Sequence, residues 1–138
     1  MGAYISQTTL ELHWGADNVA QWSNLGNTTL NGSTVAADTS RIDEAIALGE
    51  GLIESRFRDS RYTLPLSGSA SSMAVVRRWM SVASKVMLYR GRGTQDEVSA
   101  RVELEMTQVM QEIDTYLSGQ RRIDLSLARN QAGCPTVV

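Results

Sequence analysis

The chain has 138 residues, of which 42% are hydrophobic, and its 13 basic and 15 acidic side chains give a formal net charge of −2. This length fits one domain with a sizeable core, and the near balance of charge excludes a general attraction to nucleic acid. Cys134 is the single cysteine, so neither an internal disulfide nor a multi-cysteine zinc site is expected. No apolar run approaches the roughly 20 residues that span a bilayer, which predicts a protein without membrane contact.

The N-terminal part predicts short helices followed by a loop. Ser6 is expected to cap a helix that runs to about Trp14 and stops at Gly15, and Asp17 begins a further helical turn. Residues 24–38 are rich in Asn, Thr, Gly and Ser, which predicts a long loop or a weak hairpin.

Three longer helices are predicted from apolar side chains that recur at helical spacing. The first opens at Ser40 and contains Gly49, which would let a neighbouring helix approach closely. The second runs from about residue 72 to residue 90. The third begins with a capping box of Thr94 and Glu97, runs to about residue 117 and stops at Gly119.

The second of these long helices is basic and the third is acidic. A short Gly-Arg-Gly connection would fold them into an antiparallel hairpin. Their opposite charges then either flank the apolar seam within one chain or meet across a subunit boundary, and both alternatives stay open. The side chains expected to make these inter-helix or inter-subunit contacts are Arg77, Arg78, Lys85, Glu103, Glu105 and Glu112.

Residues 61–67 form an apolar segment that contains a proline and therefore cannot continue a helix. Proline removes a backbone donor and favours an extended conformation in the residue before it, so β or polyproline geometry is expected. The apolar side chains need a surface to cover, which is either a partner's or the subunit's own core. From Ile123 to Leu127 apolar residues alternate as in a strand, whose partner would be residues 24–38, residues 61–67 or another chain.

Motifs of catalysis and cofactor binding do not occur in the sequence, which has no phosphate loop, dinucleotide-binding glycine motif, zinc-protease motif or nucleophile elbow. The single histidine, His13, and the distant Cys134 make no ligand set for a transition metal. We therefore expect no enzyme activity and no cofactor.

A small helical DNA-binding or regulatory protein is the alternative function. A helix-turn-helix interpretation would place the acidic last helix in the major groove, where it would repel phosphate. The preceding helix could instead present Arg77, Arg78 and Lys85 to DNA.

The motifs that carry a family resemblance are Ala3-Tyr4-Ile5-Ser6-Gln7, Leu10, Gly15-x-Asp17, Arg61-Tyr62-Thr63-Leu64-Pro65-Leu66, Leu88-Tyr89-Arg90, Glu97-Val98-x-x-Arg101 and Gly119. Over residues 3 to about 127 the chain resembles the small neck proteins of Mu-like tailed bacteriophages, which carry a similar Arg-Tyr-x-Leu-Pro-Leu block. The chain departs from that pattern at residues 68–72, where the family often has proline and acidic residues, and at Val102 or Leu104, where it has an aromatic residue.

The resemblance implies a structural virion protein, a head-to-tail connector or adaptor. Its subunits would form a ring, commonly twelvefold, between the portal and the next neck or tail protein, and would prolong the channel through which genomic DNA passes without sequence-specific binding. The protein would lie in the neck of the virion, and in the host cytoplasm during assembly. The candidate contacts with adjacent subunits or the portal are Arg61, Tyr62, Leu64, Pro65, Leu66, Arg121, Arg122, Ile123, Leu125 and Leu127.

The expected fold is mainly α. It is a small bundle of three longer helices with short N-terminal helices, a long loop and an extended C-terminal tail. Residues 1–119 would form the helical adaptor domain and residues 120–138 the tail.

Overall fold

The computed structural model describes residues 2–24, 29–30, 34–92 and 97–127. Within these ranges the predicted mainly helical bundle is confirmed. Its helices are α1 (Gln7–Trp14), α2 (Ala16–Ser23), α3 (Thr39–Phe57), α4 (Ala70–Arg92) and α5 (Glu97–Leu117). Between α2 and α3, β1 (Thr29–Leu30) pairs antiparallel with β2 (Thr34–Val35), so the loop contains the weak hairpin.

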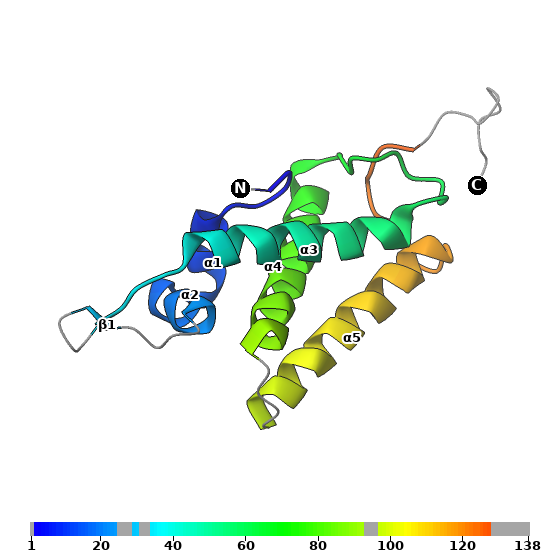
Figure 1. Cartoon of the computed structure of the whole chain (residues 1–138). Coiled ribbons are helices and arrows are strands. Elements are labelled where there is room, and N and C mark those ends of the chain that lie inside the picture. Colours follow the sequence, from blue (N-terminus) through cyan, green and yellow to red (C-terminus); the bar gives the residue numbers. More distant parts are fainter. Residues whose placement is uncertain (1, 25–28, 31–33, 93–96, 128–138) are drawn as a thin grey trace.

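The central element of the bundle is α4, which crosses α3 and lies beside α5 (Figure 1). Every residue from position 79 to position 86 is buried, as expected for a helix with neighbours on more than one side. The predicted close approach at Gly49 is confirmed, because a Cβ there would lie 2.8 Å from the backbone nitrogen of Ser84. The absence of a side chain in α3 thus lets α4 pack directly against its backbone.

Local signals at the helix ends are mostly where the sequence places them. Ser6 caps α1 through its side chain, and Gly119, with φ of 85°, follows the end of α5. The expected start of α3 at Ser40 is corrected. Its N-cap is Asp38, whose carboxylate accepts a hydrogen bond from the Arg41 amide. The capping box predicted at Thr94 lies outside the described residues.

Two extended segments cover one end of the bundle. We call residues 61–68 the strap and residues 120–127 the tail segment; the strap leads from α3 to α4 (Figure 1). The amide of Thr63 donates to the carbonyl of Ser126, and the amide of Ser126 donates to the carbonyl of Ser67. Of the three expected pairing partners, the strap is therefore the one that the tail segment takes in the structure. Gly68 is required there, because a Cβ would collide with the carbonyl oxygen of Asp124.

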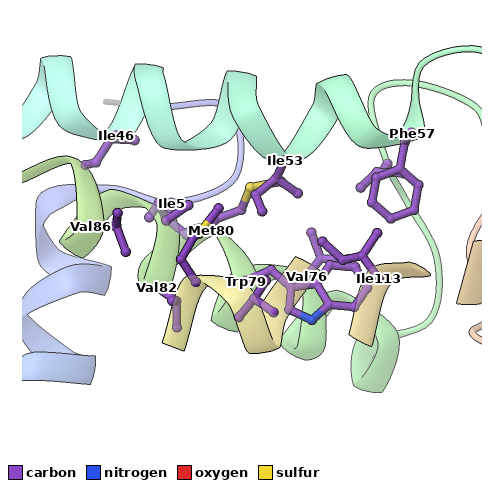
Figure 2. Packing of buried hydrophobic residues seen from close by; sticks show 14 of the residues in the cluster. Ile5, Ile46, Ile53, Phe57, Val76, Trp79, Met80, Val82, Val86 and Ile113 are labelled. Carbon is purple, nitrogen blue, oxygen red and sulfur yellow. The ribbon is translucent and has the colours of Figure 1, made fainter. Parts of the chain in front are cut away.

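The hydrophobic core continues from the helices to the strap. Figure 2 shows side chains of α3, α4 and α5 meeting between the ribbons, with Phe57 at the strap end of α3. The Phe57 ring lies 5.9 Å from the ring of Trp79 and 5.6 Å from that of Tyr62, between ring centroids. An aromatic cluster therefore joins the strap to α3 and α4, and such pairs contribute about 0.5–1.5 kcal/mol beyond area burial.

The N-terminal segment is held by a buried carboxylate. Glu50 accepts hydrogen bonds from the backbone amides of Ala3, Tyr4 and Ile5, at 2.8, 2.9 and 3.0 Å. The hydroxyl of Tyr4 donates to Glu54 and accepts from the amide of a strap residue, Leu66. Burial, together with the hydrogen bond to Glu54, raises the pKa of Tyr4 well above its usual range. The hydroxyl therefore stays protonated and links α3 to the strap.

Candidate functional site

The candidate site lies at the end of the bundle that the strap and the tail segment cover. Nowhere in the described part of the chain do three His, Cys, Asp or Glu side chains gather so as to hold a metal ion. None of the described helices is long and apolar enough to cross a membrane. His13 is exposed, and its Nδ1 contacts the hydroxyl of Ser81.

Three of the expected partner contacts belong to the subunit's own core. Tyr62, Leu66 and Leu125 are only 5%, 3% and 5% exposed. Each packs into the core cluster that includes Phe57 and Trp79. Of the two surfaces that these apolar side chains could cover, the subunit's own core is the one they contact in this chain, and little of their surface is left for a neighbouring molecule.

Other residues of that set do face outward. Pro65, Arg121, Arg122 and Leu127 are exposed, and Leu127 retains 50% of its surface. The three half-buried ones are Arg61, Leu64 and Ile123. The ten residues of the predicted contact set therefore divide into three that are buried in the strap and the tail segment and seven that are partly or fully open to other molecules.

A hollow of about 620 Å³ opens between the strap and the tail segment. We call it the strap–tail hollow. Its walls combine arginines with apolar and small side chains. They are formed by Arg61, Tyr62, Ser118, Gly119, Arg121, Arg122, Ile123, Asp124, Leu125 and Leu127.

Arg61 is held in this wall by the end of α5. Its Nη1 donates to the carbonyl of Leu117 at 3.0 Å, and its Nη2 donates to the carbonyl of Tyr116 at 2.7 Å. Nη2 also donates to the hydroxyl of Tyr62 at 3.1 Å. These carbonyls belong to the last turn of α5. That of Tyr116 also accepts a hydrogen bond from the amide of Gly119, and the guanidinium adds a bond to each carbonyl and complements the helix dipole.

The two arginines of the tail segment are less constrained. The guanidinium carbon of Arg121 lies 5.3 Å from the centroid of the Tyr116 ring, a cation–π distance. Arg122 is exposed and makes no ion pair within the described residues. The wall of the hollow thus carries one fixed guanidinium and two outer ones.

The opposite charges of α4 and α5 pair within the chain. Arg78 bonds to Glu112, and Arg90 binds Glu103 through two hydrogen bonds of 2.8 and 2.9 Å. Of the two alternatives for these charges, the structure has the intramolecular one. Arg77, by contrast, is exposed and has no ion-pair partner among the described residues.

Lys85 is buried although it is charged. Its Nζ donates to Glu105 at 2.8 Å and lies 3.7 Å from the centroid of the Trp14 ring and 5.9 Å from that of Trp22. Aromatic faces and a carboxylate replace water around the ammonium group, so Lys85 joins α1, α2 and α5 to α4. Helical periodicity alone places no aromatic ring beside Lys85, so the contact with Trp14 could not be predicted from the sequence.

Two carboxylates of α5 respond to their partners. The hydrogen bond from Arg90 lowers the pKa of Glu103. For Glu112, burial raises the pKa, but hydrogen bonds from Trp79 and Arg78 outweigh it, so the net pKa is lowered. Both groups stay ionised near neutral pH and hold the α4–α5 hairpin together.

Comparison of the chain with protein-family models, with curated proteins and with solved structures gave no match.

Proposed function

We propose that the chain is the subunit of a head-to-tail connector in a tailed bacteriophage, a ring between the portal and the next neck or tail protein. In this role the helical bundle is the body of the subunit. The outer side chains of the strap and the tail segment face the neighbouring molecules.

One observation carries the proposal: two of the motifs that carry the resemblance meet in the fold. The Tyr-Ile segment near the N-terminus and the Arg-Tyr-x-Leu-Pro-Leu block are separated by more than fifty residues. Even so, the hydroxyl of Tyr4 accepts a hydrogen bond of 2.8 Å from the amide of Leu66. A chance similarity in one motif gives no reason for contact with the other, whereas a shared structural unit does.

The block also has a definite role for most of its members. Arg61 satisfies the last carbonyls of α5, and Tyr62 and Leu66 fill the core. Leu64 is half-buried and Pro65 is exposed. The block therefore both closes the bundle and presents a small apolar outer face, which suits a subunit that docks with neighbours.

The experiment is to mix the purified chain with the portal protein of the same phage and weigh the products by mass photometry. The expected result is a complex that exceeds the portal by a ring of 15.1 kDa subunits. A chain that stays monomeric at every ratio to portal would refute the proposal. A gel-shift titration with duplex DNA, run over a range of salt, tests the DNA-binding alternative separately.

A further inference from the structure

We propose that the strap–tail hollow binds an extended acidic peptide of a partner protein. The inference goes beyond ring formation and does not require it, since it concerns the chemistry of one site on the single subunit. Three properties of the hollow carry it: its charge, the hydrogen bonds that its arginines make, and the apolar side chains in its lining.

The charge of the hollow differs from that of the chain. Arg61, Arg121 and Arg122 line it against a single acidic residue, Asp124. The whole chain, in contrast, has 13 basic and 15 acidic side chains. A net positive wall on a slightly negative protein attracts an acidic ligand to this place rather than to the surface in general.

The fixed arginine keeps donors for a ligand. A guanidinium has five N–H groups, and the three hydrogen bonds of Arg61 to described residues leave two of them. Because its position is already set by the end of α5, binding a carboxylate would cost little side-chain entropy. Arg121 and Arg122 add two further guanidinium groups to the lining and make no ion pair among the described residues.

The remaining lining favours a peptide over a simple anion. Ile123 and Leu127 give the hollow an apolar side, and Leu127 is half exposed. A peptide that alternates acidic and apolar side chains would place carboxylates on the arginines and methyl groups on this side. Inorganic phosphate would leave the apolar wall uncovered.

The lining also favours a peptide over nucleic acid. Single strands bind along grooves that follow the phosphate backbone, with bases stacked on exposed aromatic rings. Here three arginines line a single hollow, the Tyr62 ring is buried in the core rather than open for stacking, and Asp124 in the same lining would repel phosphates. A short peptide segment therefore fits better than a nucleic acid strand.

The test uses the full chain and a fluorescein-labelled peptide of about eight residues with alternating Glu and Leu, followed by fluorescence anisotropy. Removing two charge-assisted contacts in the double variant Arg121→Gln/Arg122→Gln should weaken binding by about tenfold or more. The matched control is Arg77→Gln/Arg101→Gln, which removes the same charge from exposed helix positions and should leave the affinity within about twofold.

A variant that binds the acidic peptide more tightly provides a further test, because misfolding would not increase affinity. Asp124→Asn removes the one acidic side chain from the wall and should tighten the peptide by about twofold or more. Three results would overturn the proposal: no binding of the acidic peptide to the wild-type chain, equal losses in the two double variants, or tighter binding of a Lys-Leu peptide or a single-stranded oligonucleotide. Mass photometry with portal tests ring formation separately. A negative result for peptide binding therefore does not refute ring formation, and a negative result for ring formation does not refute peptide binding.

Discussion

Replacement of Leu125 by alanine measures whether the tail segment is part of the core. The side chain is 5% exposed and packs in the same cluster as Tyr62 and Leu66. Buried Leu→Ala changes cost about 2–5 kcal/mol, and because this site borders a hollow that can contract around the gap, we expect the lower part, about 2–3 kcal/mol. At roughly 4 °C per kcal/mol for a chain of this size, the melting temperature should fall by about 8–12 °C.

Leu127→Ala is the matched control, two residues along the same segment and 50% exposed. Much of that side chain already contacts water, so its truncation should cost no more than about 1 kcal/mol. Both variants would be melted by far-ultraviolet circular dichroism and unfolded in urea. If Leu125→Ala melts within about 4 °C of wild type, the tail segment does not pack on the strap in solution and the assignment of Leu125 to the core is wrong.

Three further predictions test other parts of the fold. Gly49→Ala should lower the free energy of unfolding by about 1–2 kcal/mol, because the new Cβ meets the backbone of α4. Gly51→Ala is the control: its Cβ meets nothing within 4 Å, so the change should raise the free energy of unfolding by about 0.5–1 kcal/mol. Thermal melts compare the two variants. Glu50→Gln weakens three charge-assisted bonds to the N-terminal segment and should cost about 2 kcal/mol in urea unfolding, while exposed Glu44→Gln should change stability by less than about 0.5 kcal/mol. The pKa of Glu112 is lowered, so the ionised carboxylate stabilises the fold above the ordinary pKa of 4.5, and this stabilisation is lost as the pH falls through the lowered pKa. The difference in melting temperature between wild type and Glu112→Gln should therefore narrow from about pH 5 to pH 3. A difference that stays constant over this range would contradict the prediction.

Helices could be predicted because their signals are local. Apolar spacing, the Ser6 cap and the Gly119 stop act within a few residues, and each is present in the structure. The N-cap of α3 lies two residues before the predicted Ser40, because Asp38 and Ser40 are both good caps and only the folded geometry decides between them.

The candidate site could be predicted only in part, because its contacts are distant in sequence. Alternation shows that Tyr62, Leu64 and Leu66 need a surface, but it cannot tell whose surface that is. The answer depends on the tail segment, about sixty residues away, and on the aromatic rings of α3 and α4. The burial of Lys85 could not be predicted for the same reason, because it depends on Trp14 of another helix.

The pairing of charges within the α4–α5 hairpin also decides where a partner can bind by charge. Glu103 and Glu112, which α5 could have offered to a neighbouring subunit, are already bonded to arginines of α4. Exposed pairs of this kind contribute only about 0–1 kcal/mol to stability, but a neighbour would have to break them before using either member. Arg121 and Arg122 face no such competition among the described residues, and they stand beside a hollow with an apolar wall. We therefore expect charge-directed contacts at the strap end of the bundle, and expect charge reversal at Arg121 to disturb assembly more than the same change at Arg78.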